Sequence, residues 1–255
     1  MSCKFGFVPT SFVDSPGGTS SVVFFDRCNV RCPYCHQAKL LTGGGEFDLQ
    51  EIKDKIYNHS FKNGKPRTEW LILSGGEPTL FSREMLELID FGKSTGRKVG
   101  IWTNGMTDLK SVEADWFNID YKWRFDDYAN KCGATNEQAV RIKENMFEML
   151  MDHDRWFRLT TVITHSHTDA YIGEMVKSLL LNVVNRYSRG LIMGDANGPL
   201  FTWRFVPFRA MSLDAILNAD LLDAMVIIPM REVRARVKRA MPSQNYWAVK
   251  VEGGD

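Results

Sequence analysis

Three cysteines lie within one short stretch, RCNVRCPYCHQ, which occupies positions 27–37. Cys28, Cys32 and Cys35 have the spacing C-x3-C-x2-C, and His36 follows directly. Cysteine thiolates are the usual protein ligands of zinc and of iron–sulfur clusters. The spacing therefore predicts a metal site, and three merely structural thiols are the less favoured interpretation.

The number of available ligands separates two kinds of metal site. A structural zinc is closed by four protein ligands, and His36 is adjacent to Cys35, so the two rarely reach one ion together. Cys3 or Cys132 could supply the fourth ligand, but neither has a neighbouring cysteine. A 4Fe–4S cluster held by three cysteines keeps one iron open, as a catalytic cluster needs. We therefore predict an iron–sulfur cluster, with zinc as the alternative.

The elements that position this loop alternate between strands and helices. The loop follows Ser21–Phe25, an apolar run typical of a buried strand. The other predicted strands are Trp70–Leu73, Lys98–Trp102, Trp116–Tyr121, Phe157–Ile163 and Phe201–Val206. The predicted helices are Glu46–Phe61, Ser82–Ser94, Glu137–Met151, Asp169–Asn185, Ser212–Met225 and Arg231–Ala240. The alternation predicts an α/β fold of βαβ units with a parallel sheet, open or curled into a barrel.

Short polar and glycine-rich motifs follow these strands, at the edge of a parallel sheet where chemistry is commonly placed. Gly75 and Gly76 let a ligand approach the backbone closely, and Glu77 supplies a carboxylate. Thr103 and Asn104 begin a turn after the next strand. An ordinary glycine turn before a helix is the alternative for the first motif.

A possible acid–base pair ends the Trp116–Tyr121 strand. Asp120 and Lys122 are two residues apart, so their side chains point the same way. A surface ion pair is the alternative. His165 and His167 follow a later strand, and they are more often ordinary loop histidines than metal ligands.

The cysteine loop and Ser74–Pro78 together resemble the radical S-adenosylmethionine (SAM) superfamily. In that family three cysteines, here Cys28, Cys32 and Cys35, hold a 4Fe–4S cluster whose fourth iron binds SAM. Reductive cleavage of SAM yields a 5′-deoxyadenosyl radical that abstracts hydrogen. The resemblance implies a TIM-like partial (β/α)6 barrel with parallel strands, open on one side, and with the cluster loop after the first strand.

The same resemblance implies residue roles. An aromatic residue lies by the adenine, Gly-Gly-Glu binds the amino group of SAM, Thr-Asn lies near its methionyl end, and the RLTTV segment lines the site. The implied SAM-binding residues are Tyr34, Gly75, Gly76, Glu77, Thr103, Asn104, Arg158 and Val162. In activating enzymes of the superfamily the Asp-x-Lys segment lies in the active site, which implies catalytic roles for Asp120 and Lys122.

The order of the motifs resembles the activating protein of anaerobic ribonucleoside-triphosphate reductase and, more broadly, the activating enzymes of glycyl radical enzymes. A D-x-P-G segment at Asp14–Gly17 precedes the cysteine loop, and GGEPT, TNG and D-x-K follow it. The resemblance is strong to about residue 125 and looser after it. It implies a glycyl radical enzyme as the protein substrate and a flavodoxin- or ferredoxin-type electron donor.

Three residues depart from that pattern. Arg27 stands where glycine is usual, Gln37 where asparagine is usual, and Trp102 where some activating enzymes place an aspartate that helps to hold a cation. The departures leave open a radical SAM enzyme that acts on a small molecule, a peptide or a modified nucleotide. A non-catalytic zinc- or cluster-binding module is the third hypothesis.

The bulk composition limits the remaining possibilities. The 255 residues are expected to form a single domain, with a motif core over about 12–125 and a looser half over 126–255. The 32 basic and 31 acidic residues give a net charge of +1, which provides no electrostatic reason to expect a nucleic-acid or membrane partner. The sequence shows no signal-peptide pattern and no membrane-length apolar run, so we expect a cytoplasmic protein.

Overall fold

The computed structural model describes residues 3–35, 37–62, 65–151, 156–164, 166–179, 201–207, 235, 239 and 249–252. The chain forms two compact units. Unit 1 consists of Met1–Asn29 and Gln37–Asn118, and unit 2 of Val30–His36 and Ile119–Asp255. The division falls inside the cysteine loop, so Cys28 belongs to unit 1. The single domain expected over the whole chain stays a prediction.

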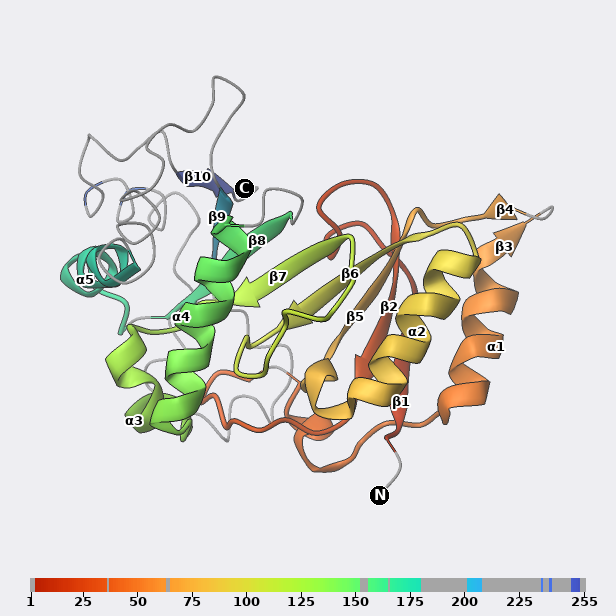
Figure 1. Ribbon diagram of the computed structural model, residues 1–255, viewed down its shortest axis with the longest axis horizontal. Helices are drawn as coiled ribbons and strands as arrows, with labels where there is room; N and C mark the ends of the chain where they lie inside the picture. The colour runs from red at the N-terminus through yellow and green to blue at the C-terminus, as the bar shows by residue number, and fades with distance from the viewer. Residues whose placement is uncertain are drawn as a thin grey trace. The chain divides into compact units, whose positions relative to one another are not determined.

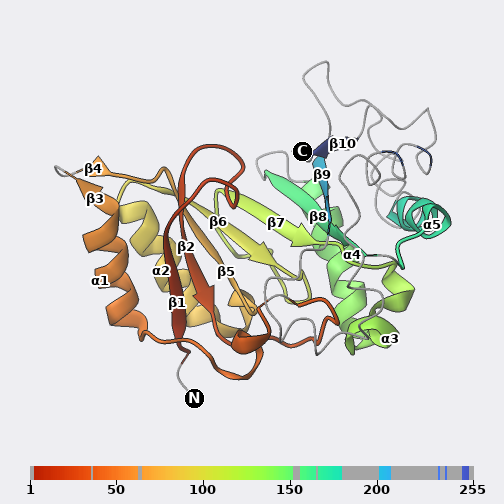
Figure 2. The same cartoon turned by 180° about the vertical axis from the view of Figure 1, so that it is seen from behind.

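A sheet with the strand order β1-β2-β5-β6 forms the centre of unit 1. Its strands are β1 (Phe5–Ser11), β2 (Ser20–Phe25), β5 (Trp70–Gly75) and β6 (Lys98–Thr103). The last three are parallel, as predicted, whereas β1 runs antiparallel to β2 (Figure 2). The cysteine loop therefore follows the first parallel strand. The sequence did not predict β1, because its Gly6 and Pro9 are unfavourable strand residues.

Two helices, α1 (Leu49–Ser60) and α2 (Ser82–Ser94), lie side by side on this sheet (Figure 1). A capping box starts α1: Asp48 Oδ1 accepts the backbone N–H of Glu51 at 2.9 Å, and Asp48 N–H donates to Glu51 Oε2 at 2.7 Å. The buried apolar side chains of the helices and of the sheet include Ile52, Ile56, Met85, Leu88, Ile89, Val23, Leu71, Leu73 and Val99.

A second apolar cluster in unit 1 is rich in tryptophan. Trp70 and Trp116 pack with Val22 and Ile72, and Phe24 and Trp102 pack against them. The ring centroids of Trp70 and Trp102 lie 6.3 Å and 6.4 Å from that of Trp116. We call Trp70, Trp102 and Trp116 the tryptophan cluster. Shorter elements of unit 1 are η1 (Ala38–Thr42), η2 (Pro78–Phe81), β3 (Phe61–Lys62) and β4 (Lys65–Pro66).

Unit 2 also contains parallel strands. β8 (Phe157–Ile163), β9 (Phe201–Pro207) and β10 (Val249–Glu252) pair in that order, and each pair is parallel. The division between the units falls within β7 (Trp116–Asp120). The predicted strands correspond to β7, β8 and β9, whereas β10 was not predicted.

The helical elements of unit 2 are η3 (Phe125–Asp127), α3 (Tyr128–Cys132), α4 (Asn136–Met151) and α5 (Asp169–Leu179). Thr135 and Gln138 cap α4 reciprocally, since Thr135 N–H donates to Gln138 Oε1 at 2.8 Å and Gln138 N–H to Thr135 Oγ1 at 3.2 Å. The predicted helix over Glu137–Met151 is confirmed. The end of Asp169–Asn185, all of Ser212–Met225 and most of Arg231–Ala240 lie outside the described residues.

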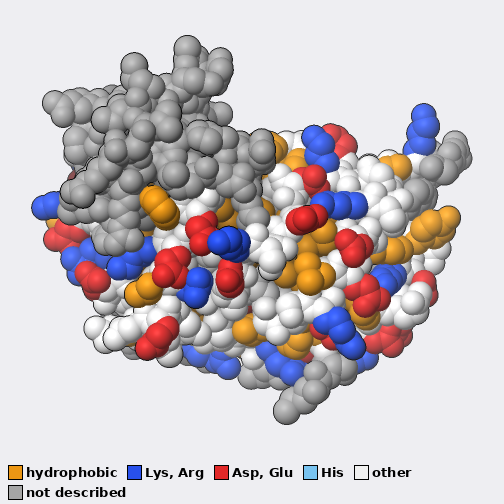
Figure 3. All heavy atoms as spheres, in the orientation of Figure 1, with side chains coloured by type: hydrophobic (Ala, Val, Ile, Leu, Met, Phe, Trp, Pro, Cys, Tyr) orange, Lys and Arg blue, Asp and Glu red, His pale blue; other side chains and the backbone are white. Residues whose placement is uncertain are grey.

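The predicted fold class is confirmed: parallel strands alternate with helices in an α/β arrangement. On the face in Figure 3, acidic and basic side chains are interspersed rather than gathered by sign. Lys53 of α1 and Glu87 of α2 form an ion pair. In the part of the chain that the structure describes, every helix is too short or too polar to cross a membrane.

Candidate active site

Two asparagines surround the sulfur of Cys28 at the end of β2. Asn29 Oδ1 lies 3.7 Å from Cys28 Sγ, and Asn104 Nδ2 lies 3.9 Å from it. Asn104 Nδ2 also donates to Asn29 Oδ1 at 2.7 Å. The turn after β6 thus reaches the first cysteine of the loop. Asn104 was predicted as a site residue, but Asn29 was not, because nothing in the spacing of the cysteines marks the residues between them.

Glu77 connects the ends of β5 and β6. It is 1% exposed, and its Oε1 accepts hydrogen bonds from Thr79 N–H at 3.2 Å, from Thr79 Oγ1 at 2.7 Å and from Thr103 Oγ1 at 2.7 Å. Its Oε2 accepts the backbone N–H of Asn104 at 2.7 Å. Burial raises the pKa of Glu77 above its ordinary value of 4.5, although the hydrogen bonds act in the opposite direction. The carboxylate therefore holds Asn104 in place, and its contact with SAM stays a prediction.

Gly75 and Gly76 lie where the chain approaches itself closely. Gly75 has a φ of 109°, and a Cβ on it would come within 2.5 Å of the backbone N of Phe25. A Cβ on Gly76 would lie 1.8 Å from the carbonyl oxygen of Arg27, which accepts the N–H of Glu77 at 2.8 Å. From the sequence, we interpreted these glycines as positions where a ligand approaches the backbone closely. In the structure the backbone at the end of β2 already requires it, and binding of SAM by these residues stays a prediction.

Arg27 has a backbone conformation that favours glycine. Its φ is 64°, in the left-handed region, which costs a residue with a side chain about 1–2 kcal/mol. At this position, the activating enzymes whose motif order this sequence resembles usually have glycine. The Arg27 guanidinium lies 5.8 Å from the ring centroid of Phe81, a favourable contact that offsets part of the cost.

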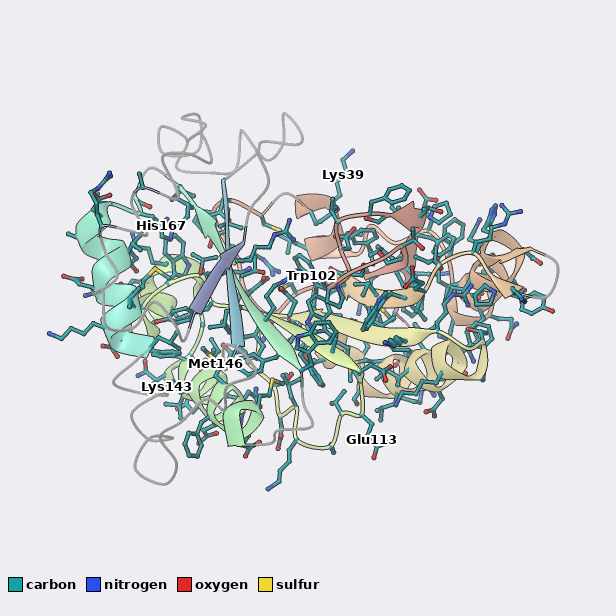
Figure 4. The ribbon with its side chains drawn as sticks, turned by 90° about the horizontal axis from the view of Figure 1, so that it is seen from above. Lys39, Trp102, Glu113, Lys143, Met146 and His167 are labelled. Atoms are coloured by element: carbon teal, nitrogen blue, oxygen red, sulfur yellow. The ribbon has the colours of Figure 1, made fainter. Side chains whose placement is uncertain are left out.

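Trp102 occupies the position where some activating enzymes place an aspartate. Its indole N–H donates to the backbone carbonyl of Asp14 at 2.8 Å, and its ring packs into the tryptophan cluster. Figure 4 labels Trp102. The side chain thus joins β6 to the D-x-P-G segment, Asp14–Gly17. An indole offers no oxygen ligand to a cation.

Trp102→Phe is expected to lower the free energy of unfolding by about 1 kcal/mol, because the substitution deletes the hydrogen bond to Asp14 but keeps an aromatic ring. Thermal or urea unfolding measures the change. Trp156→Phe is the matched control, since Trp156 is 52% exposed. Equal stability of both variants would show that the bond to Asp14 contributes nothing.

In unit 2, Asp120 and Lys122 form an ion pair whose side chains are 25% and 13% exposed. Burial disfavours the charged form of Lys122, but the charge of Asp120 and then those of Cys32 and Cys35 raise the pKa of Lys122 above its ordinary value of 10.5. The D-x-K segment and these two cysteines are therefore electrostatic neighbours. Catalysis by Asp120 and Lys122 stays a prediction.

A row of three neighbouring aromatic rings begins at Tyr34, which lies between Cys32 and Cys35 in the sequence. The ring centroids of Tyr34 and Trp123 are 5.3 Å apart, and Trp123 stacks on His167 at 4.8 Å. His167 Nδ1 accepts the backbone N–H of Thr164 at 3.1 Å, which places the ring proton on Nε2. Nε2 then donates to the backbone carbonyl of Lys122 at 3.2 Å. His167, beside α5 in Figure 4, therefore supports Lys122 through its backbone.

The sequence singled out neither Trp123 nor these contacts of His167, since the partners come from separate loops.

Two further predicted SAM residues lie on one strand. Arg158 is the second residue of β8 and is buried, while Val162 is the sixth and is half-buried. Four residues of strand separate them by about 13 Å, so they do not meet at one point. His36 and His165 lie outside the described residues.

Asp120→Ala is expected to lower the free energy of unfolding by about 2 kcal/mol, because it leaves the largely buried ammonium of Lys122 without its carboxylate. Asp120→Asn keeps an acceptor oxygen and should lose less. Unfolding curves of both variants at pH 7 measure the difference. A loss equal in the two variants would mean that the charge of Asp120, rather than its hydrogen bond, stabilises the fold.

The donor chemistry of the cysteine loop fits an iron–sulfur cluster. Cys28, Cys32 and Cys35 are half-buried and form no disulfide, whereas Cys3 and Cys132 are buried. The loop has neither helix nor strand at the three positions. Among the described residues, no three His, Cys, Asp or Glu side chains are gathered as a ligand set.

Comparisons with known proteins agree with this chemistry. The family model described as the radical SAM superfamily matches residues 22–179. MJ1227 of Methanocaldococcus jannaschii, named as a candidate glycyl-radical enzyme activating enzyme, is 34% identical over 154 residues, which are 57% of this chain and 60% of that protein. The 7-carboxy-7-deazaguanine synthase of Haemophilus influenzae is 33% identical over 105 residues, 41% of this chain and 42% of the relative. The pyruvate formate-lyase-activating enzyme of Clostridium pasteurianum is 33% identical over 96 residues, 36% and 39% of the two chains.

The chain thus spans between about 40% and 60% of the length of these relatives. Among solved structures, SuiB of Streptococcus suis bound to S-adenosylmethionine has a TM-score of 0.58 at 11% identity. That likeness covers 89% of this chain and 48% of SuiB, and it supports the fold. The family match covers more than half of the chain and includes all three cysteines of the loop. The protein therefore belongs to the radical SAM superfamily, whose members use a 4Fe–4S cluster and SAM.

Proposed function

We propose that the protein cleaves SAM reductively and installs a glycyl radical on a partner enzyme such as an anaerobic ribonucleotide reductase. The observation that carries this proposal is the similarity to MJ1227, which extends over 154 residues. The similarity to the deazaguanine synthase of H. influenzae extends over 105 residues. The order of the D-x-P-G, cysteine, GGEPT, TNG and D-x-K motifs supports the same branch.

In this proposal Cys28, Cys32 and Cys35 hold the cluster. When bound, the cluster supplies the electron that breaks the sulfonium C–S bond of SAM. Asn104 and Asn29 position Cys28 from one side of the loop. Lys122 places a positive charge beside the other two cysteines, which offsets part of the negative charge of a thiolate site.

The first test is reductive cleavage of SAM. The protein is reconstituted anaerobically with iron and sulfide, reduced with dithionite and given SAM, and 5′-deoxyadenosine is measured. The next assay adds a glycyl radical enzyme encoded near this gene, first with dithionite and then with a flavodoxin- or ferredoxin-type donor. We expect the electron paramagnetic resonance doublet of a glycyl radical on the partner. SAM cleavage without any such doublet would overturn the activating role but not the radical chemistry.

The second candidate is an enzyme that acts on a small molecule. Two observations favour it: four of the relatives are named 7-carboxy-7-deazaguanine synthase, and Trp102 replaces an aspartate found in some activating enzymes. The same assay separates the candidates. Cleavage of SAM that depends on a small-molecule substrate, and not on a protein partner, would support the second candidate. A colourless protein with about one zinc per chain would instead support the non-catalytic module.

A further inference from the structure

Cys132 is a buried thiol outside the cluster motif, and it lies against the cysteine loop of unit 2. It ends α3 and is 3% exposed. Its thiol donates to the backbone carbonyl of Tyr128 at 3.2 Å, and it is hydrogen-bonded to the thiol of Cys32. The backbone is fixed at the same point, since the N–H of Arg31 donates to the carbonyl of Cys132 at 3.0 Å.

The two thiols differ in access to solvent. Cys32 is half-buried, whereas Cys132 is covered. An oxidant from solution therefore meets Cys32 first, and Cys132 is the thiol already in contact with it. Cys35 is related to Cys32 by a backbone turn, in which Cys35 N–H donates to the carbonyl of Cys32 at 3.1 Å. That turn makes the Cys32–Cys35 disulfide the competing outcome.

We propose that Cys32 and Cys132 are a redox-active pair, which closes to a disulfide whenever Cys32 is not engaged as a cluster ligand. A sulfur atom bound in a disulfide is not a thiolate ligand, so the disulfide and the cluster exclude each other. The disulfide would protect Cys32 from irreversible oxidation to a sulfinic acid. It would also make cluster assembly depend on a thiol reductant that opens the disulfide. The proposal does not depend on which substrate the enzyme uses.

The chemistry is a thiol–disulfide exchange with a small-molecule disulfide such as oxidised glutathione. The thiolate of Cys32 attacks one sulfur of glutathione disulfide, which forms a mixed disulfide and releases one glutathione thiolate. The sulfur of Cys132 then attacks the Cys32 sulfur, gives its proton to solvent and releases the second glutathione. Two protein thiols lose two electrons in total, and one glutathione disulfide is reduced to two glutathione thiols.

Peptide mapping tests the pair directly. The full chain is stripped of metal with a chelator under reducing conditions, transferred to anaerobic buffer and incubated with glutathione disulfide. Remaining thiols are alkylated, and a tryptic digest is analysed by mass spectrometry without reduction. Trypsin cleaves after Arg31 and Lys131, so the expected product joins the peptide Cys32–Lys39 to the peptide Cys132–Arg141. Fragmentation and the Cys35→Ser variant identify which sulfur of the first peptide is joined.

The wild-type map decides the proposal. We expect the cross-linked peptide to become the main form of Cys132 and to disappear on addition of dithiothreitol, after which iron and sulfide rebuild the cluster. Cys132→Ser should abolish the cross-linked peptide and leave Cys32 either bound to glutathione or in a disulfide with Cys35, whereas Cys3→Ser, which changes the other buried thiol, should leave the cross-link intact. A disulfide within Cys32–Lys39 together with an alkylated Cys132 would overturn the proposal. So would a cross-link that does not hinder cluster assembly.

Discussion

Cys32→Ala is expected to lose the cluster and to lower SAM cleavage by at least about 100-fold. Substitution of a group that only hydrogen-bonds a metal ligand already costs about 10- to 100-fold in metal affinity or activity, so removal of a ligand itself should cost at least as much. Cys28→Ala and Cys35→Ala should behave alike, because each removes one of three ligands. Iron and sulfide content, the absorbance of the reconstituted protein and 5′-deoxyadenosine formation measure the effect.

Cys3→Ala is the control for this loss. Cys3 is also a cysteine, but it is buried outside the loop, and its thiol donates to Asp26 Oδ1 at 3.4 Å. Its substitution should leave the iron content unchanged. If Cys32→Ala kept a full cluster and full SAM cleavage, the assignment of the loop as the cluster site would be wrong. If Cys32→Ala kept the iron but lost cleavage, a different residue would be the third ligand.

Local patterns were sufficient to predict most of the strands. Within β2 and β8, residues 22–25 and 159–163 are apolar or β-branched throughout, as strands buried on both faces are. β1 and β10 lack that signal, and their pairing with β2 and β9 depends on segments elsewhere in the chain. A strand that is stabilised mainly by pairing with its neighbour cannot be recognised from its own residues alone.

The candidate site was predictable to the level of motifs but not of contacts. The spacing of the cysteines identified the loop, because few other functions require three thiols so close together. The sequence could not show that Asn29 faces Asn104, or that His167 supports Lys122, since each pair joins separate loops. It also could not show that Cys132 contacts Cys32, since the two cysteines are 100 residues apart and Cys132 has no neighbouring cysteine.

Glu77→Ala is expected to lower the free energy of unfolding by about 4 kcal/mol. The substitution leaves the backbone N–H groups of Thr79 and Asn104 without acceptors in a buried site, and each such group costs about 1–3 kcal/mol. Glu113→Ala is the matched control, since Glu113 is exposed and its side chain can be seen in Figure 4. Urea unfolding of both variants measures the difference, and equal losses would contradict a connecting role for the Glu77 carboxylate.

The pH dependence provides a second, independent test of Glu77. Because burial raises its pKa above 4.5, the folded protein binds this proton more tightly than the unfolded chain does. The contribution of Glu77 to stability is therefore fully present below about pH 4.5 and declines as pH rises through the pKa of the folded protein. Glu77→Gln has no such proton, so the stability of the wild type relative to this variant should fall over that range. A relative stability that is constant or rises with pH would show that Glu77 is ionised without cost.

The iron content and the SAM requirement of Glu77→Gln separate the structural role of Glu77 from its predicted contact with SAM. If Glu77 acts by holding Asn104, Glu77→Gln should disturb the Cys28 side of the loop as well, and the iron content and the SAM requirement should change together. If Glu77 binds SAM directly, the SAM requirement should rise while the iron content stays at the wild-type level. The four hydrogen bonds that the carboxylate accepts within the protein leave it few positions for a ligand, so we expect the coupled change.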